Sequence, residues 1–290
     1  MKLQELLATT SLKATGQKIG LDIQIVEGCL VCKPLDQEDP RYNTDLILPS
    51  MRMVEACRAN DFDFFQPFIA AGKLTEEQMH RASERYHLGK TRSGQPVFWM
   101  IDDMLTPLDA HIGNAWISTL LKKREPLLQH WCPTHCLFGQ HLLSDKGQVS
   151  GPTEDRSFHS KNIPHEEARR ARTFLEERGL SPYLETVAIV ENEAAAVVLS
   201  ELFPETVWMA YATTAHLTPD LFAPLEGRTV TLYPRTDPTL STFLFFENLA
   251  DTTRRQYDID LTVDDTLEVH ATASQKERCV DLLEFLTDNL

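Results

Sequence analysis

Three carboxylates follow two apolar runs that have the length and composition of buried strands. Glu191 comes directly after the run 186–190, and Glu193 stands a little further on; Asp237 follows the run 228–233. Because the carboxyl ends of parallel strands lie at one edge of a sheet, we expect these side chains near one another at that edge. Carboxylate oxygens are the ligands that Mg²⁺ prefers, and a bound phosphate can supply further oxygens. The residues therefore allow a magnesium-dependent reaction at phosphate, in which Glu191 transfers a proton and Asp237, with Glu193, holds the metal.

The same acids also have structural explanations that need no ligand. Glu191 could cap the helix that we predict after its strand, and Asp237 could close a turn before Pro238. Arg235 stands between the strand and Asp237. Its cation would compete with a metal ion for a shared carboxylate, by an energy on the order of several kcal/mol where water is scarce. The metal-site and the structural explanations place these acids at the same edge of the sheet. They differ in the partner of the carboxylates, which is a metal ion in the first and backbone groups in the second.

A regular alternation of strands and helices positions these acids. The apolar runs 186–190, 206–210 and 228–233 are separated by intervals with a helical pattern. This alternation predicts a parallel sheet joined by right-handed crossovers. The predicted fold class is therefore α/β, a Rossmann-like parallel sheet flanked by helices, with an N-terminal α+β region before it. The expected divisions are a small β-containing segment over 1–49, an α+β region over 50–144, an insertion with a helix over 145–182, and the α/β domain over 183–290.

Elsewhere the clearest signals are local. Residues 21–26 and 29–33 have the alternation expected of two strands in a hairpin. Thr75 and Gln78 form a capping box, which predicts that a helix begins there. The other elements that we expect are an acidic loop over 102–114, a strand over 267–269 and one closing helix over 274–290.

The composition is that of a soluble protein with an acidic surface. Its 28 basic and 43 acidic residues give a formal charge of −15, which argues against indiscriminate nucleic-acid binding but leaves room for a local basic groove. No apolar segment has the length needed to span a bilayer, and six cysteines without regular spacing fit a reducing compartment. We therefore expect a cytoplasmic protein with no membrane partner.

Two groups of cysteines and histidines have residue types that suit zinc. A structural zinc site needs four converging ligands. The first group is a single pair whose members would point to opposite faces of a strand, and the second matches no standard zinc-module spacing. We therefore expect free thiols and no zinc. The groups are Cys29 with Cys32, and His130, Cys132, His135 and Cys136.

Short sequence patterns over most of residues 60–290 are similar, in the same order, to those of one known family. The patterns lie at 85–89, 97–102, 116–121, 136–143, 187–193, 208–210, 230–234, 269–273 and 280–286. Together they resemble the Toprim-like domain of primase-related proteins from bacterial mobile elements. The resemblance implies a Toprim-like fold. For the family, it implies a magnesium site made by a glutamate after the first strand and an Asp-x-Asp pair after a later one.

The sequence differs from the family's catalytic pattern at three places. Glu191 matches the glutamate, and Asp237 matches the second acid of the pair. The first acid of the pair has become a cation, and a lysine after the glutamate has become an alanine. A glycine loop that would let phosphate approach the backbone has lost its glycines. The substituted positions are, in that order, Arg235, Ala194, and Ala212 with Thr213.

These differences lead to three hypotheses. The first is a degenerate, non-catalytic Toprim-like protein that works by binding DNA or a replication protein, in the replication or maintenance of a mobile element. The second is a magnesium-dependent primase- or nuclease-like phosphotransfer enzyme that uses Glu191 and Asp237. The third is a protein-interaction or regulatory module whose acidic surface avoids or mimics nucleic acid. Metal binding near Glu191 distinguishes the second from the others, and a salt-dependent affinity for DNA distinguishes the first from the third.

Overall fold

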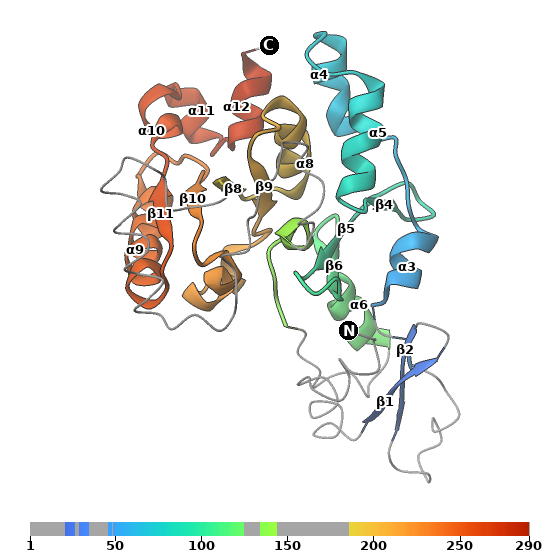
Figure 1. Cartoon of the computed structure of the whole chain (residues 1–290). Helices are drawn as coiled ribbons and strands as arrows, with labels where there is room; N and C mark the ends of the chain where they lie inside the picture. Colours follow the sequence, from blue (N-terminus) through green and yellow to red (C-terminus); the bar gives the residue numbers. More distant parts are fainter. Residues whose placement is uncertain are drawn as a thin grey trace, which may run out of the picture.

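The computed structural model describes residues 21–26, 29–34, 46–47, 49–124, 134–143 and 186–289 (Figure 1). These residues form one parallel sheet and two antiparallel sheets. No helix within these ranges is long and apolar enough to cross a membrane.

The parallel sheet is the one predicted from the alternation of strands and helices. Its strands lie in the order β11-β10-β8-β9, and each neighbouring pair is parallel. The strand β8 is apolar because it is covered on both faces, and all its residues after the first are buried. In β10 and β11 buried and more exposed residues alternate, because only one face of these strands is covered. The predicted α/β architecture is therefore confirmed. The strands are β8 (Thr186–Val190), β9 (Val207–Ala210), β10 (Thr229–Leu232) and β11 (Asp260–Val263).

The domain around this sheet has three layers, with α9 on the outer side in Figure 1 and α8 on the inner side. Side chains alternate along β8, so that Ala188 packs in the core under α8 and Ile189 in the core under α9. The same alternation holds along β9, where Trp208 and Met209 belong to different cores. The covering elements are α8 (Glu193–Leu202) on one face, and α9 (Ser241–Gln256) with the 3-10 segment η5 (Pro219–Leu225) on the other.

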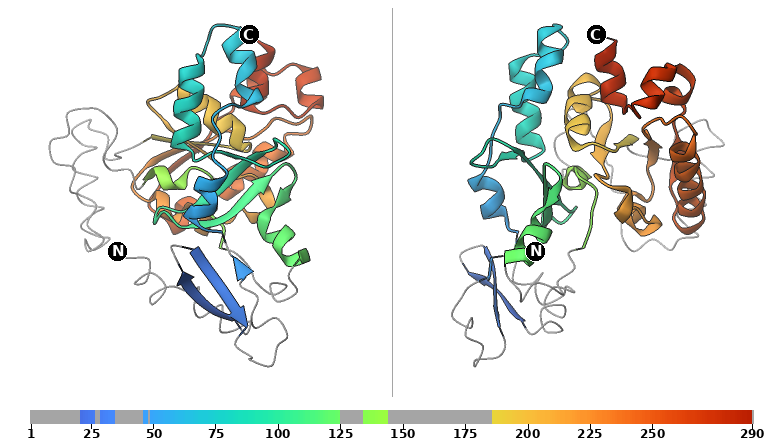
Figure 2. Two further views of the ribbon diagram at one scale, coloured as in Figure 1. Left: turned by 90° about the vertical axis from the view of Figure 1, so that its right-hand side faces the viewer. Right: turned by 180° about the vertical axis from the view of Figure 1, so that it is seen from behind.

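The antiparallel sheet β4–β7 packs on the α8 side of the domain. Its strand β5 is buried on both faces, since Phe98 joins the core under α8 and Trp99 packs with α3. Helix α5 begins at the predicted capping box of Thr75 and Gln78 and lies beside α8 in both views of Figure 2. The elements of this region are α3 (Met51–Ala56), η1 (Asp63–Phe65), α4 (Gln66–Ala70), α5 (Glu76–Arg85), β4 (Gly89–Lys90), β5 (Pro96–Ile101), β6 (Pro107–Ile112), β7 (Ala115–Trp116) and α6 (Ile117–Arg124).

The prediction of an acidic loop over 102–114 was wrong, because strand β6 lies there and pairs with β5. The carboxylate of Asp102 accepts hydrogen bonds from the backbone N–H groups of Met104 and Thr106, at 2.9 and 2.8 Å, and so closes the connecting turn. Asp109, in the middle of β6, is buried, and its carboxylate accepts hydrogen bonds from the backbone N–H groups of Ala110 and Ser118 at 2.8 and 2.9 Å. The acids that suggested a loop therefore have local structural partners, and they hid the strand.

Two predictions near the C-terminus were also wrong. Residues 267–269 belong to helix α10 (Thr266–His270) instead of a strand. The expected single closing helix consists of α11 (Ala273–Glu277) and α12 (Leu282–Asp288). A short apolar run does not distinguish a strand from a helical segment, and Cys279, with a φ of 53°, interrupts the helical path between α11 and α12.

The N-terminal hairpin was predicted correctly. Strands β1 (Leu21–Val26) and β2 (Cys29–Pro34) pair in antiparallel fashion, and β3 (Leu46–Ile47) pairs with β2.

One hydrophobic core joins the antiparallel sheet β4–β7 to the parallel sheet. Tyr86, at the end of α5, is fully buried, and its hydroxyl donates to the carbonyl of Trp208 in β9 at 2.7 Å. Phe138 and Ala210 exchange two backbone hydrogen bonds of 2.8 and 3.0 Å, so the segment 134–143 lies along β9. The loop after β9 in turn reaches β7, where the rings of Trp116 and His216 lie 5.6 Å apart.

Candidate functional site

The predicted acids lie where the connections of the parallel sheet diverge. From β8 the chain crosses through α8 to β9 on one side, and from β10 it crosses through α9 to β11 on the other side. The loops that leave β8 and β10 therefore separate above the edge of the sheet, which is the usual position of a ligand site in an open α/β fold. Glu191 follows β8, and Arg235 follows β10.

Glu191 and Arg235 form a two-pronged ion pair at this point. The Nε and Nη2 groups of Arg235 donate to the two carboxylate oxygens of Glu191. The side chain of Glu191 is 17% exposed and that of Arg235 is 44% exposed. Both oxygens of the candidate catalytic acid are therefore held by a cation of the protein itself. The helix cap that we considered for Glu191 is provided by Asn192 instead.

Two further groups lie near this pair, and the sequence did not point to either. Tyr211 follows β9; its side chain is buried, and burial together with the charge of Glu191 raises the pKa of its hydroxyl well above the usual value. Asp281 caps α12 by accepting a hydrogen bond from the N–H of Glu284 at 2.8 Å. Burial raises the pKa of Asp281 to about 6, and the charges of Glu284 and Glu191 contribute to the rise. The neighbourhood of Glu191 therefore carries negative charge in addition to its own.

Asp237 closes the start of α9. Its Oδ1 accepts hydrogen bonds from the N–H and hydroxyl of Thr239, at 2.7 and 2.6 Å, and from the N–H of Ser241 at 3.3 Å. Its Oδ2 accepts from the N–H of Thr242 at 2.7 Å and from the hydroxyl of Ser241 at 3.3 Å. Burial alone would raise the pKa of Asp237, but the hydrogen bonds from Thr239 and Thr242 lower it below its usual range. Both oxygens of the candidate metal ligand are thus used by the helix start.

Glu193, the other candidate metal ligand, pairs with a histidine of the antiparallel sheet. Its Oε1 lies 2.6 Å from Nδ1 of His111 on β6, and its side chain is only 6% exposed. The hydrogen bond with Glu193 is the main reason that the pKa of His111 is raised, and burial opposes it. This pair joins the first turn of α8 to β6, a contact between residues far apart in the chain.

The substituted family positions have local structural roles. Ala212 has a φ of 59°, in the left-handed region that favours glycine. The hydroxyl of Thr213 accepts a hydrogen bond from the N–H of Ala215 at 3.3 Å and caps the short segment η4 (Thr214–His216). The N–H of Ala194 donates to the cap residue Asn192 at 2.9 Å. The loop after β9 therefore keeps one backbone conformation typical of glycine without having the residue.

Family and structure comparisons add one finding. A family model described as a domain of unknown function, DUF6371, matches residues 146–236. The match includes β8, α8, β9 and β10 and therefore contains Glu191 and Arg235. Neither the search of curated proteins nor the search of solved structures found a match.

The candidate acids therefore have three separate partners: an arginine, a helix start and a histidine. In the part of the chain that the structure describes, no three His, Cys, Asp or Glu side chains come together as a group that could hold a metal ion. We call the place where the loops after β8 and β10 separate the divergence point. There the partly exposed guanidinium of Arg235, next to buried acids, is the group that a ligand could contact.

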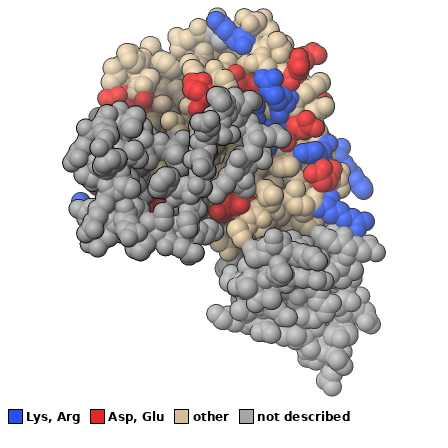
Figure 3. Space-filling view, in the orientation of Figure 1, with Lys and Arg blue, Asp and Glu red and all other residues tan. Residues whose placement is uncertain are grey.

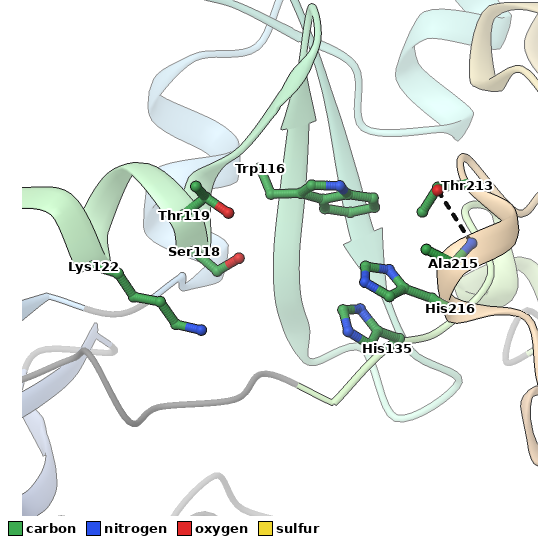
Figure 4. Close-up of a pocket in the computed structure, with 8 residues that line it drawn as sticks. All are labelled: Trp116, Ser118, Thr119, Lys122, His135, Thr213, Ala215 and His216. Atoms are coloured by element: carbon green, nitrogen blue, oxygen red, sulfur yellow. Dashed lines mark hydrogen bonds between the residues drawn. The ribbon is translucent and has the colours of Figure 1, made fainter.

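A cavity of about 270 Å³ lies beside the loop after β9 (Figure 4). It contains none of the candidate acids, and the sequence did not predict it, because its residues come from three segments that only the fold brings together. Its lining residues are Trp116, Ser118, Thr119, Lys122, His135, Thr213, Ala215 and His216.

Of the two groups with zinc-like residue types, the structure describes the side chains of two members. His135 stacks on His216, with ring centroids 3.5 Å apart. Burial raises the pKa of Cys136 well above its usual value, as is typical of a packed thiol. His130, Cys132 and the side chains of Cys29 and Cys32 lie outside the described residues.

Proposed function

We propose that this chain is a non-catalytic Toprim-like protein that works by binding DNA or a replication protein, in the replication or maintenance of a mobile element. The family and the biological setting rest on the sequence resemblance. The loss of catalysis is supported most directly by the ion pair of Arg235 with Glu191. In a magnesium enzyme of this kind the glutamate must be free to bind the metal ion or to accept a proton. Here both of its carboxylate oxygens accept hydrogen bonds from one guanidinium.

Electrostatics explains why this pair disfavours a metal ion. A divalent cation about 4 Å from a guanidinium is repelled by roughly 8 kcal/mol at an effective dielectric constant of about 20. Water around the partly exposed Arg235 reduces the repulsion, but the acids that could offset it have other partners. Recruiting Asp237 to a metal would remove the hydrogen bonds that its carboxylate accepts from the N–H groups of Ser241 and Thr242 at the start of α9, a loss of about 0.5–2 kcal/mol by analogy with a helix cap. These terms act in the same direction, against a magnesium site at the divergence point.

Binding to nucleic acid through this surface is expected to depend on local contacts and not on a broad positive field. The chain has a formal charge of −15. On the face shown in Figure 3, the lysines and arginines of the described residues lie among aspartates and glutamates and form no separate basic tract. Each phosphate contact releases about one counterion, so few contacts give a shallow dependence of affinity on salt. We therefore expect such a shallow dependence for any complex with DNA.

Magnesium titration of the full-length chain tests the lost metal site. We expect no saturable change in the amide NMR signals around Glu191 in the wild type. We expect a saturable change in Arg235→Asp, because this substitution frees Glu191 and adds a second acid. Arg255→Asp is the matched control, since Arg255 is an exposed arginine in the last turn of α9. Saturable magnesium binding by the wild type, or a magnesium-dependent phosphotransfer activity that Glu191→Gln abolishes, would overturn the proposal.

A separate titration tests the partner. Fluorescence anisotropy with labelled single- and double-stranded DNA, at low and at moderate salt, measures both the affinity and its salt slope. A measurable affinity that falls with added salt supports DNA as the partner. No binding to either form at low salt would remove DNA from the proposal and favour the protein-interaction hypothesis.

A further inference from the structure

The cavity beside the loop after β9 has two chemically different walls. In Figure 4 the hydroxyls of Ser118 and Thr119 and the ammonium of Lys122 lie on the α6 side. The rings of Trp116 and His216 lie on the opposite side. A polar, cationic wall opposite a ring-bearing wall suits a ligand that has an anionic group and a planar ring.

Lys122 supplies the positive charge of the polar wall. It stands one helical turn after Ser118 on α6, so that the two side chains share one face of the helix. No ion pair of Lys122 occurs among the residues that the structure describes, and its ammonium is available to a ligand. The next residue, Lys123, is exposed and does not line the cavity. The chain therefore offers its own control for the position of the charge.

Ring contacts hold the wall formed by Trp116 and His216 in place. His216 stacks on His135, with centroids 3.5 Å apart and an angle of 16° between the planes, and Trp116 lies 5.6 Å from His216. Trp116 also stacks on His111 at 4.9 Å, and His111 is fixed by Glu193 at 2.6 Å. Rings that are fixed before a ligand arrives lose little entropy on binding it.

The charges around His135 and His216 affect the protonation of these two imidazole rings. Burial lowers the pKa of His135 and of His216, and Lys122 lowers that of His135 further. Asp109, a buried acid on β6, raises the pKa of both rings, and its Oδ2 has no hydrogen-bond partner among the described residues. His111 and Glu193 form a mutually compensating pair behind them. An anion in the cavity would add a second negative charge, which raises the pKa of both imidazoles.

We propose that this cavity binds a nucleotide, with the base against the rings of Trp116 and His216 and the phosphate against Lys122 and the hydroxyls of α6. A volume of about 270 Å³ is close to the lower end of the range for small-ligand pockets, roughly 300–1,000 Å³. This size suits a mononucleotide or the terminal nucleotide of a single strand, and it excludes a duplex. The proposal goes beyond the binding function proposed above, because the cavity includes neither Glu191 nor Arg235.

Zinc is the competing ligand for a wall that contains two imidazoles. A zinc site needs three or four converging ligands. His135 and His216 face each other as parallel rings, and no third His, Cys, Asp or Glu joins them in a metal-binding group within the described ranges. The geometry is therefore that of a stacking surface.

Isothermal titration of the full-length chain with a set of probes tests the nucleotide site. The probes are adenosine and thymidine 5′-monophosphates, adenosine, ribose 5-phosphate, and a short oligothymidylate with and without a 5′-phosphate. We expect one of the phosphorylated nucleotides or the phosphorylated strand to bind at least about tenfold more tightly than adenosine or ribose 5-phosphate, because each of these lacks one of the two recognised groups. Preference for the free monophosphate or for the strand identifies the source of the nucleotide.

Variants and pH complete the test. Lys122→Ala should weaken binding about tenfold, whereas Lys123→Ala should change it by less than about twofold. His216→Ala should weaken binding as well, and it should reduce the pH dependence of the affinity between about pH 8 and about pH 6, a range in which the phosphate itself also titrates. Equal effects of the two lysine substitutions, binding that does not depend on the phosphate, saturable binding of Zn²⁺ that His216→Ala abolishes, or no binding of any probe at millimolar concentration would each overturn the proposal.

Discussion

Replacement of Glu193 by glutamine removes a buried charge from the contact that joins the first turn of α8 to strand β6. The side chain of Glu193 is 6% exposed, and that of His111 is 19% exposed. Because the hydrogen bond with Glu193 raises the pKa of His111, the pair is a carboxylate with an imidazolium at mildly acidic pH. Glutamine keeps the size of the side chain and can keep one hydrogen bond, but it leaves the imidazolium without a counter-charge.

The expected loss of stability follows from the burial of the pair. Breaking a buried ion pair costs about 3–5 kcal/mol, and a hydrogen bond to a charged group contributes about 1.5–3 kcal/mol. Since Glu193→Gln retains a hydrogen bond and His111 is partly exposed, we expect a loss of about 2 kcal/mol at about pH 6. The folded pKa of His111 lies above the unfolded value of about 6.5, so the stabilisation is complete below that pH and disappears as the pH rises through the folded pKa. The destabilisation by Glu193→Gln should therefore be small at about pH 9.

Urea unfolding of the wild type and the variant at the two pH values measures this difference. Glu205→Gln is the control, because it removes the same formal charge at an exposed position. NMR titration of the imidazole ring gives an independent measurement, in which the pKa of His111 should fall in Glu193→Gln. An equal loss of stability at both pH values, together with an unchanged pKa of His111, would refute the reasoning.

Two other predictions concern residues around the divergence point. Asp281→Asn should keep the cap of α12 and remove a carboxyl whose pKa is about 6 in the folded protein. A protein with an acid whose folded pKa is raised loses stability as the pH rises through that range. Urea unfolding should therefore show that the variant is more stable than the wild type by about 2 kcal/mol near pH 7 and equally stable near pH 4. A gain of stability at both pH values would contradict this explanation. Ala212→Gly should stabilise the loop after β9 by about 0.5–1 kcal/mol, because Ala212 has a φ of 59°. Ala273→Gly, in the first turn of α11, should destabilise the protein in the same unfolding assay, and a loss in both variants would show that the backbone of Ala212 is not strained.

The parallel sheet could be predicted because its signals are local. The run 186–190 is apolar throughout, as strands buried on both faces must be, and Asn192 begins a helix directly after it. The topology of such a sheet brings the ends of β8 and β10 to one edge, which is why the residues after these two strands could be expected there. The ion pair of Glu191 with Arg235 shows the two loops meeting at that edge, whereas Asp237 and Glu193 have other partners.

The contacts that link distant segments could not be predicted in this way. The partner of Glu193 is a histidine on β6, a strand whose acids gave it the appearance of a loop. Asp281 reaches the neighbourhood of Glu191 because the closing segment breaks into two helices, and no local pattern marked that break. The cavity lined by Lys122 and His216 depends on the packing of α6 against the loop after β9. In each case the decisive information is a tertiary contact and not a local preference.

The pairing of Phe138 with Ala210 has a consequence for self-association. A strand at the margin of a sheet offers unpaired N–H and C=O groups, which can recruit a strand from another molecule. At the carboxyl end of β9 those groups already bond within the chain. Intermolecular strand addition is thereby directed to the opposite margin at β11, which begins with the exposed acid Asp260. Because the carboxyl end of β9 is already paired, two copies joined at β11 would leave no further free margin there, so the fold favours a closed pair over open-ended growth through this sheet.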